Sequence, residues 1–464
     1  MDVKISIIGA GSAVFSLKLL RDICLTEGLR GSRVCFMDVD EERLNLAYGL
    51  ASRYARELKR EDLRFEKTLD RRTALEDADF VINTALSGGH AASEMERRIE
   101  GEHGYYMGML CFSGTGKYTM GTYLRQLKLM LDIARDMEDI CPDAWLIQAS
   151  NPVFDGCTLM TRETKIKVIG LCHGHHGVYR IAEVLGLDPK EVNFQAVGIN
   201  HCIWLTDLRY RGEDAYPLID EWIERHAEDY WKTWDGEPTD VQMSPASVFL
   251  YKMFGLFPVG DTPRFAGAWW FHTDLETMKR WFNKYGGFDS ETGWKYYLKR
   301  LGEQLDRMRE IHGSSKPITA EIPPQLSGEQ HIPIIDALIN DNRGIFQVNV
   351  PNQGCIKGIG DDVVVEVPAV IDGKGVHPLH VGALPKFLTL HINRTHVIPM
   401  ELGLKAFLEG DERILLYLIL SDQRTRSLEQ AQKLIEKEMA LPHNRDLRRH
   451  FKTKLGLPKG KTLH

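Results

Sequence analysis

The sequence predicts an α/β protein whose first half forms a mostly parallel, doubly wound sheet. Three observations support this prediction. Strand-like and helical segments alternate over residues 4–199, a glycine pair separates the first strand from the first helix, and polar residues follow the ends of several strands. Alternation of this kind favours a parallel sheet with helices on both of its faces.

The first half contains the strands and helices that such a sheet needs. Residues 4–10 are rich in β-branched side chains and are predicted to form the first strand, and an amphipathic run follows to about residue 27. The second strand is predicted at residues 33–38 and is followed by a charged helix at 41–59. Later elements are expected to be strands at 79–84, 144–148, 167–171 and 192–199 and a helix at 177–186.

The second half is predicted to form an α+β domain. Its expected elements are a hairpin-like segment at 204–212, a charged helix at 295–312, strands within 360–384 and helices within 397–441. We expect residues 1–200 to bind a nucleotide and residues 201–464 to provide substrate binding and oligomerisation. The active site is then expected at the boundary between the two.

Composition and charge indicate a folded chain and disfavour two kinds of binding partner. The 464 residues are 43% apolar and 27% charged, which is typical of a folded chain with a large core. The net charge of −7 disfavours a nucleic-acid or anionic-membrane partner, and no apolar run approaches the roughly 18 residues that span a bilayer. The N-terminus lacks the features of a signal peptide, and eight cysteines without a Cys-x-x-Cys pair favour reduced thiols. We therefore expect a cytoplasmic protein.

A short glycine motif follows the first predicted strand. Gly9, Gly11 and Ser12 lie where missing Cβ atoms allow a pyrophosphate to approach the N-terminus of a helix. Asp38 ends the second strand, where a carboxylate binds ribose hydroxyls and repels a 2′-phosphate, so NAD is favoured over NADP. Val14 replaces the third glycine of the usual motif. The alternative is a tight turn beside a solvated aspartate.

Further polar residues follow the later strands. The carboxyl ends of parallel strands share one edge of a sheet, so Asn83, Asn151 and Cys172 are expected around one crevice, with Asn83 near the nucleotide. His201 follows the strand at 192–199 and is a candidate to meet Cys172 there. A thiolate and an imidazole suit Mn²⁺, Fe²⁺, Co²⁺, Ni²⁺ or Zn²⁺ in an open site. The alternative is that Cys172 is a small buried hydrophobe.

An ordered set of motifs resembles glycoside hydrolase family 4. The set comprises IIGAGS near the N-terminus, SNP in mid-chain, CHG after a strand, GINH further on, and then FPVGDTPR and VEVPAVID. This family is an exception to glycoside hydrolysis by two carboxylates because it depends on NAD. The resemblance implies a fold like that of lactate and malate dehydrogenases, a need for NAD⁺ and a divalent metal, usually Mn²⁺, and a homodimer or homotetramer.

The resemblance also implies a reaction. NAD⁺ oxidises the sugar C3 hydroxyl, a base removes the C2 proton, the C1–O bond breaks by elimination, water adds at C1, and C3 is reduced again. Cys172 and His201 correspond to the metal ligands, and Asn151 to a substrate-binding residue. His173 is a candidate general acid near the glycosidic oxygen, because a histidine suits proton transfer near neutral pH.

Three further positions take their roles from the same resemblance. Asp261, in the segment GDTPR, corresponds to the base that removes the C2 proton. Arg264 is expected either to contact the substrate or to hold Asp261 in its ionised form. His175 is a candidate substrate contact, although a polar loop before the helix at 177–186 would explain His175 and His176 equally.

Two features indicate which sugar is cleaved. The CHG sequence at Cys172 resembles the uronidases of the family. Lys117 stands where members that act on neutral sugars carry a carboxylate, and a cation there would pair with a C6 carboxylate of the substrate. The alternative for Lys117 is a solvated surface lysine. The sequence therefore predicts an α-glucuronidase, with an α-galacturonidase or α-glucosidase of the same family as alternatives.

Two readings from other classes remain open on the sequence alone. An NAD-dependent 2-hydroxy acid dehydrogenase would share the glycine motif but would consume NAD stoichiometrically. A nucleotide sensor without activity would have no use for Cys172, His201 and Asp261 at one place.

Overall fold

The computed structural model describes residues 2–12, 16–106 and 119–452. The chain divides into two compact units. The first comprises residues 1–86 and 130–390, and the second comprises residues 87–129 and 391–464. The functional division at residue 200 concerns binding roles and stays a prediction. Among the described helices, none is both long and apolar enough to cross a membrane.

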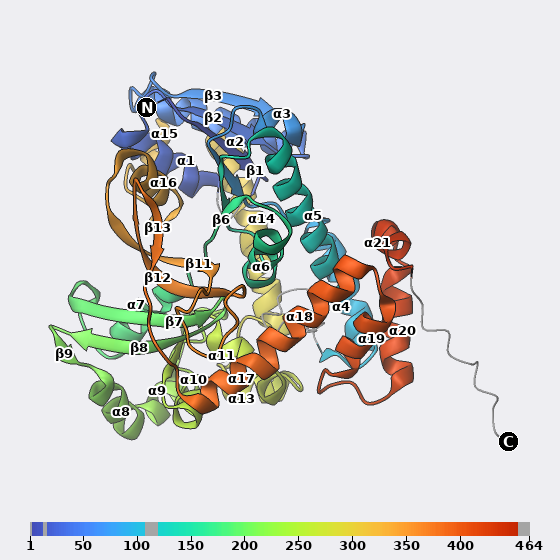
Figure 1. The fold of residues 1–464 in the computed structure, drawn as a ribbon. Coiled ribbons are helices and arrows are strands. Elements are labelled where there is room, and N and C mark those ends of the chain that lie inside the picture. Colours follow the sequence, from blue (N-terminus) through green and yellow to red (C-terminus); the bar gives the residue numbers. More distant parts are fainter. Residues whose placement is uncertain (1, 13–15, 107–118, 453–464) are drawn as a thin grey trace. The chain divides into compact units, whose positions relative to one another are not determined.

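A single large sheet runs through the first unit (Figure 1). Its strand order is β10-β8-β7-β12-β11-β6-β5-β4-β1-β2-β3, with β13 paired to β12 and β9 paired to β8. The parallel part consists of β1 (Lys4–Ile8), β2 (Arg33–Met37), β3 (Arg64–Thr68), β4 (Phe80–Asn83), β5 (Trp145–Gln148) and β6 (Lys167–Gly170). The predicted α/β fold class and its parallel sheet are confirmed.

The sequence did not predict strand β3. The strand lies at the end of the sheet, and its segment RFEKT has no fully buried side chain. An edge strand that is exposed on both faces lacks the alternation of apolar and polar residues from which strands are recognised.

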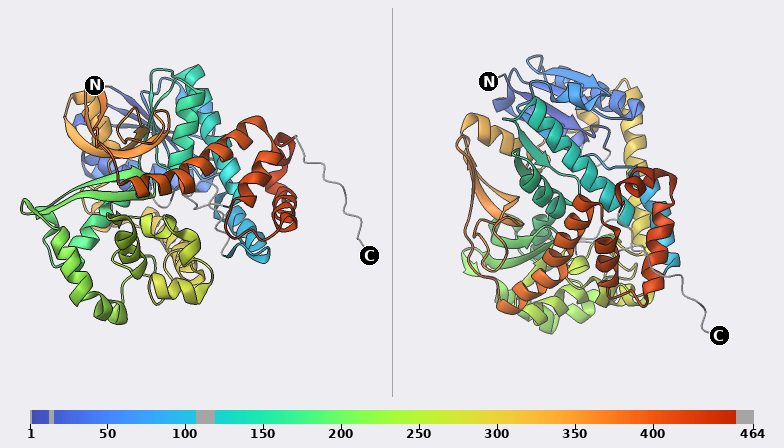
Figure 2. Two further views of the ribbon diagram at one scale, coloured as in Figure 1. Left: turned by 60° about the horizontal axis from the view of Figure 1, so that its bottom comes forward. Right: turned by 45° about the vertical axis from the view of Figure 1, so that its right-hand side comes forward.

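The other part of the sheet is antiparallel. It consists of β7 (Val192–Ile199), β8 (Cys202–Tyr210), β9 (Glu213–Asp214), β10 (Phe257–Val259), β11 (Gly344–Pro351), β12 (Val364–Asp372) and β13 (Gly375–Pro378). The hairpin predicted at 204–212 is only the short β8–β9 turn, because β8 pairs over its whole length with β7. Figure 2 shows β12 beside β7, although more than 160 residues separate them, and Glu366 is in register with Gly198.

Helices cover the sheet of the first unit. They include α1 (Ser16–Leu25), α2 (Glu41–Glu57), α3 (Arg71–Leu75), α6 (Val153–Glu163), α7 (Gly177–Val184), α14 (Glu291–Gly313), α15 (Ile318–Glu321) and α16 (His331–Asn340). A second group lies around β8 and β10 and comprises α8 (Tyr216–Arg225), α9 (Ala227–Thr233), α10 (Pro245–Phe254), α11 (Thr262–Phe265), α12 (Ala268–Phe271) and α13 (Leu275–Trp281). The core beneath α7, α8 and α10 includes Val178, Ile203, Leu205, Ile219 and Phe257.

The described part of the second unit is helical. It contains α4 (Gly89–Glu102), the start of α5 (Met120–Ile140), α18 (Ile398–Glu409), α19 (Glu412–Leu420), α20 (Leu428–Met439) and α21 (Arg445–His450), and α17 (Lys386–Ile392) leads into it. The helical prediction for 397–441 is confirmed, but the segment forms three helices. The first break is at Gly410, which caps α18 in the left-handed conformation.

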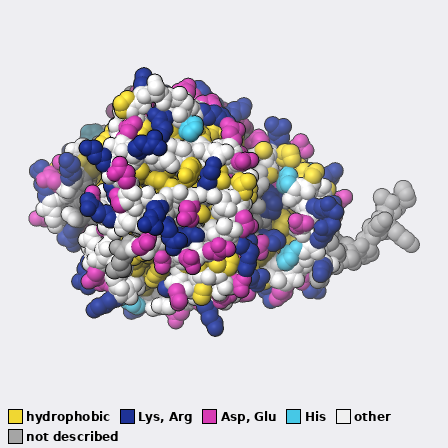
Figure 3. Space-filling view, turned by 90° about the horizontal axis from the view of Figure 1, so that it is seen from above, with side chains coloured by type: hydrophobic (Ala, Val, Ile, Leu, Met, Phe, Trp, Pro, Cys, Tyr) yellow, Lys and Arg dark blue, Asp and Glu magenta, His cyan; other side chains and the backbone are white. Residues whose placement is uncertain are grey.

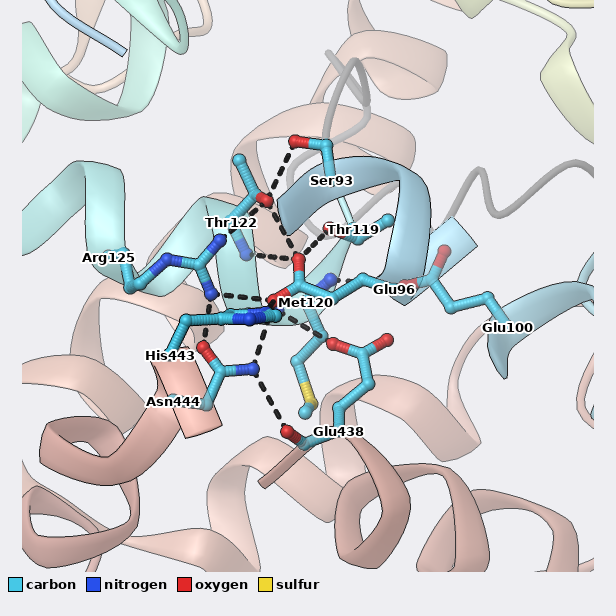
Figure 4. A network of polar contacts seen from close by, with 11 residues as sticks. Ser93, Glu96, Glu100, Thr119, Met120, Thr122, Arg125, Glu438, His443 and Asn444 are labelled. Carbon is cyan, nitrogen blue, oxygen red and sulfur yellow. Dashed lines mark hydrogen bonds and ion pairs between the residues drawn. The ribbon is translucent and has the colours of Figure 1, made fainter. Parts of the chain in front are cut away.

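A buried polar network ties the second unit together (Figure 4). Glu96 of α4 accepts hydrogen bonds from Arg125 Nη1 at 2.6 Å, Asn444 Nδ2 at 2.9 Å and the Thr122 amide at 2.9 Å. Nearby, Glu438 of α20 accepts from the Gly121 amide at 2.8 Å. Each buried carboxylate oxygen that accepts a hydrogen bond in this way avoids the free-energy cost of being buried without a partner. The network therefore joins α4, α5, α20 and the segment before α21.

On the face of the molecule shown in Figure 3, Lys and Arg side chains are intermixed with Asp and Glu side chains.

Candidate active site

The glycine motif and Asp38 meet at the carboxyl ends of β1 and β2. The Gly11 amide donates to Asp38 Oδ2 at 2.7 Å, and the amides of Gly9 and Ala10 both donate to the Met37 carbonyl at 2.9 Å. Gly9 has φ +82°, and a Cβ there would lie 2.6 Å from Ala85 Cα. A Cβ at Gly11 would lie 2.5 Å from Arg43 Cβ. Only glycine fits either position, so the turn has the close backbone approach that a dinucleotide site requires.

Asn83 ties strand ends together. Its side chain is fully buried, and Nδ2 donates to Gln148 Oε1 at 2.9 Å while Oδ1 accepts from the Ala85 amide at 3.1 Å. The Asn83 carbonyl accepts from the amides of Ala149 and Ser150 at 3.0 Å. The Asn83 amide is thus engaged within the protein, and its contact with a cofactor stays a prediction. Asn151, which follows, has its Oδ1 buried without a hydrogen-bond partner among the described residues.

The loop after β6 packs on the turn after β10, backbone against backbone. Gly260 has φ +67°, and a Cβ there would lie 2.5 Å from the Gly174 carbonyl oxygen. A Cβ on Gly174 would lie 3.8 Å from each of three atoms, which are Cys172 Sγ, Gly260 Cα and Ile203 Cδ1. The glycines therefore bring three segments together, those that carry Cys172, Asp261 and the strand that follows His201.

Gln242 fastens the turn that carries Asp261. Its Nε2 donates to the Gly260 carbonyl at 2.7 Å, and the Gly260 amide donates back to its Oε1 at 3.2 Å. A Cβ on Gly177 would lie 2.7 Å from the same Oε1. Gly177, the second glycine of CHGHHG, therefore leaves the space that the Gln242 side chain occupies when it bonds Gly260.

His201 lies in the turn between β7 and β8 and is buried. Its backbone is left-handed, with φ +64°. Its ring stacks on Phe265 with centroids 5.4 Å apart, and Nε2 lies 3.4 Å from Asp261 Oδ2. Within the described ranges, no group of three or more His, Cys, Asp or Glu side chains could hold a metal. A metal site formed by the pair of Cys172 and His201 stays a prediction.

Arg264 is a buried cation between two carboxylates. Its Nη1 donates to Asp261 Oδ1 at 2.5 Å, and its Nε donates to Asp289 Oδ2 at 2.7 Å. Its guanidinium lies 4.2 Å from the centroid of the Phe288 ring. Burial opposes the charge, but Asp289 and then Asp261 outweigh it and raise the pKa of Arg264. Arg264 thus contacts Asp261 directly, and its role in holding Asp261 ionised stays a prediction.

Asp289 and His272 were not recognised in the sequence. His272 Nε2 lies 3.5 Å from Asp289 Oδ2. Burial alone would raise the pKa of Asp289, but the charge of Arg264 and the contact with His272 hold it well below its usual range. Neither residue lies in a motif, so only the fold reveals that they support Asp261 through Arg264.

Glu366 of β12 is a second buried carboxyl that sequence reasoning missed. It accepts a hydrogen bond from Asn200 Nδ2 at 3.0 Å, one residue before His201. Burial raises the pKa of Glu366 to about 7, although Asn200 opposes this shift. A signal was available, because a glutamate within the apolar run VVVEVPAVI is unusual for a buried strand.

The two histidines that follow Gly174 differ from His173. His173 is 56% exposed at its side chain, whereas His175 is buried against His176 and Phe194. Burial lowers the pKa of His175 to about 3, so its ring is neutral. A substrate role for His175 stays a prediction. Lys117 lies outside the described residues.

Two sequence models of one family match nearly the whole chain. Family 4 glycosyl hydrolase matches residues 4–187, and the Family 4 glycosyl hydrolase C-terminal domain matches residues 196–425. The chain belongs to glycoside hydrolase family 4. The predicted family is thus confirmed, and the motifs described above lie within the matched ranges.

Individual members of the family resemble the chain over most of its length. An alpha-galactosidase of Bacillus subtilis is 30% identical over 85% of this chain and 87% of its own. An alpha-galacturonidase of Thermoanaerobacterium saccharolyticum is 28% identical over 94% of this chain and 95% of its own.

Solved structures share the fold. A putative glucosidase, lplD, from Bacillus subtilis has a TM-score of 0.78 at 23% identity and covers 94% of this chain and 99% of its own. A 6-phospho-alpha-glucosidase from gut microorganisms, in complex with NAD and Mn²⁺, has a TM-score of 0.72 at 19% identity, over 95% of this chain and 98% of its own.

Proposed function

We propose that this family 4 member is an NAD- and Mn²⁺-dependent α-glycosidase that cleaves uronides. The observation that carries the proposal is the meeting of three segments at the glycine contact, which brings the loop of Cys172 to the turns of His201 and Asp261. A dehydrogenase of 2-hydroxy acids would use the glycine motif at β1 but not this arrangement. The cytoplasmic location and a homo-oligomer stay predictions.

Each cofactor has residues that fit it. Gly9, Gly11 and Asp38 would hold NAD, because a Cβ would fill the space at either glycine. Cys172 and His201 would hold the metal, since a thiolate and an imidazole suit Mn²⁺ and its neighbours in the series. When bound, the two groups supply hydride exchange at the sugar C3 and Lewis-acid stabilisation of its oxygens.

The chain itself handles the protons and the orientation of the sugar. Asp261, held by Arg264, accepts the C2 proton. His173, which is exposed at the loop after β6, donates a proton to the glycosidic oxygen as the C1–O bond breaks. Asn151 Oδ1, buried without a described partner, accepts a hydrogen bond from a sugar hydroxyl.

The uronide is supported by sequence. The Gly174 of the CHG motif and Lys117 both favour an acidic sugar, and we put the α-glucuronide first. An α-galacturonide is the second candidate, because four of the matched relatives are named alpha-galacturonidase.

The test compares p-nitrophenyl α-glucuronide, α-galacturonide and α-glucoside with NAD⁺, Mn²⁺ and a thiol reductant. We expect turnover of a uronide at least about 10-fold above the glucoside, since a charge-assisted bond contributes roughly 1.5–3 kcal/mol. Removal of NAD⁺ or chelation of the metal should abolish turnover, and NADH should not accumulate. Turnover of the glucoside alone would overturn the uronide, and NADH formed in proportion to product would overturn the glycosidase.

A further inference from the structure

Glu329 is a buried carboxylate beside the catalytic loop, and no role above uses it. It lies just before α16, and its side chain is only 7% exposed. Its Oε1 lies 2.8 Å from Lys18 Nζ of α1 and 3.9 Å from His173 Nδ1. Its Oε2 lies 4.0 Å from His331 Nδ1. A carboxylate is rarely buried unless it is paired, so these contacts require an explanation.

Helix α1 fixes the position of Glu329 through a second contact. Asp22, one turn after Lys18, accepts hydrogen bonds from the amide of Ser327, at 2.8 Å, and from its hydroxyl. The Glu329 amide in turn donates to Ser327 Oγ at 3.1 Å. The segment is therefore held on α1 at two points four residues apart. Lys18 holds the carboxylate of Glu329 itself, and Asp22 holds the chain two residues before it.

The charge of Glu329 has two basic partners. Burial raises its pKa, but the nearby His173 and Lys18 outweigh burial and hold it below its usual value, so the group is a carboxylate. Burial lowers the pKa of His331 to about 4, which leaves that ring neutral. Lys18 makes the close ion pair. Among the described residues, the other N–H group beside Glu329 Oε1 is the ring of His173, at 3.9 Å.

An imidazole has two nitrogens, and the partner of one decides what the other does. A carboxylate beside Nδ1 favours the form in which Nδ1 carries hydrogen. Nε2 is then the atom that exchanges a proton with another molecule. The same logic underlies the pairing of a histidine with a carboxylate that orients it in many hydrolases. A separation of 3.9 Å is an ion-pair contact rather than a hydrogen bond, and such contacts often shorten when a substrate binds.

We propose that Glu329 is a positioning residue that orients His173 for proton transfer to the leaving group. The inference rests on the role of His173 in the proposed function. Nδ1–H points to Glu329, and Nε2–H points to the glycosidic oxygen. As the C1–O bond breaks, its electron pair stays on the oxygen, which takes the proton from Nε2. Nδ1 keeps its proton throughout.

The test is a leaving-group comparison with Glu329→Gln, which removes the charge and keeps the shape. p-Nitrophenolate leaves without much help, whereas a methoxide needs a proton, so the variant should lose kcat selectively on the methyl uronide. We expect the ratio of kcat for the p-nitrophenyl and methyl uronides to rise at least about 10-fold over wild type, the scale of general acid catalysis being roughly 100-fold or more. Equal losses on both substrates would overturn the proposal.

Asp22→Asn is the matched control. It weakens the other anchor of the same segment on α1 but leaves the carboxylate of Glu329 in place. We expect the control to leave the ratio of kcat values unchanged. A rise in the ratio like that of Glu329→Gln would show that the position of the segment, and not the carboxylate of Glu329, affects the reaction. That result would overturn the proposal.

A second readout does not depend on activity. The ¹⁵N shifts of the His173 ring, identified by their loss in His173→Gln, report which nitrogen carries hydrogen. With NAD and diamagnetic Zn²⁺ bound, wild type should show hydrogen on Nδ1, and Glu329→Gln should show a mixture. An unchanged spectrum would overturn the proposal. If wild type cleaves no glycoside but the spectra differ as expected, the proposed function has failed while the orientation by Glu329 stands.

Discussion

Arg264 shows how a single residue can organise a site that lies on several elements. Its guanidinium is buried and bonded to two carboxylates, Asp261 and Asp289. The planar fork of arginine suits two partners at once, which a lysine could not match. Since Asp289 already balances the buried charge, Asp261 can approach a substrate without leaving Arg264 unpaired.

Replacement of Asp289 by asparagine tests this balance. The change leaves a buried cation with one carboxylate, and loss of a partner from a buried pair costs about 3–5 kcal/mol. We expect Asp289→Asn to lower the free energy of unfolding on this scale and to lower kcat by about 10-fold or more, because Arg264 loses the partner that fixes its position toward Asp261. Denaturant unfolding and kcat measurements check both.

The control for this variant is Asp207→Asn. Asp207 pairs with Arg209 on the surface, with about half of each side chain exposed. Such pairs contribute roughly 0–1 kcal/mol. A loss at Asp289 no larger than that at Asp207 would contradict a supporting role for Asp289.

At the scale of elements, the site depends on the contact between the loop after β6 and the turn after β10. Neither strand end alone brings Cys172 near Asp261. The contact needs glycine at position 260, because a Cβ there would lie 2.5 Å from the Gly174 carbonyl oxygen. Packing of backbone on backbone leaves little room for adjustment, so the two loops hold a fixed separation.

Gly260→Ala should separate the two loops. An alanine with positive φ costs roughly 1–2 kcal/mol in any case, and here it also displaces Gly174. We expect kcat to fall on the order of 100-fold, since displacement of about 1 Å at a catalytic group has an effect of this size. Steady-state kinetics would measure it.

Gly212→Ala is the control that distinguishes the effect of backbone strain from the loss of the contact between the two loops. Gly212 has φ +86° but nothing within 4 Å of the position of a Cβ. Its replacement should lower stability by a similar amount and leave kcat unchanged. Equal kinetic losses at the two glycines would show that the contact between the loops is not what matters.

These elements also show which features of the fold and of the site can be predicted from the sequence. The glycine turn, Asp38, Cys172 and His201 follow predicted strands, and the fold places each at a strand end because local pattern determines such positions. Strand β3 was missed because it is exposed on both faces. Asp289, Glu366 and Glu329 are brought to the site by packing between distant segments, which no local pattern encodes. Gly260 belongs to the FPVGDTPR motif, but its contact with Gly174 is visible only in the fold.

At the scale of the whole molecule, each unit has its own source of stability. The first is built on the sheet and its apolar core. The second relies partly on the network of Figure 4, in which the side chains of Glu100 and Glu438 are both buried. Glu100 Oε1 accepts from the Met120 amide at 3.0 Å. Glu438 accepts from the next amide along the chain, that of Gly121, and two buried carboxyls on neighbouring amides share a proton more readily than they carry two charges.

The stability of the second unit should therefore depend on pH. Burial raises the pKa of Glu100 to about 8, above its ordinary 4.5, and the pKa of Glu438 is raised by burial and by Glu100. The folded state binds this proton more tightly than the unfolded state does. The contribution of the proton to the free energy of unfolding is therefore complete below pH 4.5 and is lost as the pH rises through about 8. We expect Glu100→Gln, which mimics the protonated group, to match wild type at pH 5.

At pH 8.5 the same variant should unfold at least roughly 4 °C above wild type, the shift that about 1 kcal/mol produces in a small domain. All nine tryptophans lie within residues 130–390, in the first unit. Tryptophan fluorescence therefore follows the first unit during thermal unfolding and serves as an internal reference, while circular dichroism at 222 nm also follows the helices of the second. Glu102→Gln, at an exposed position of the same helix, is the control and should behave as wild type. If Glu100→Gln and wild type lose stability equally between pH 5 and pH 8.5, the proton shared by Glu100 and Glu438 does not stabilise the unit.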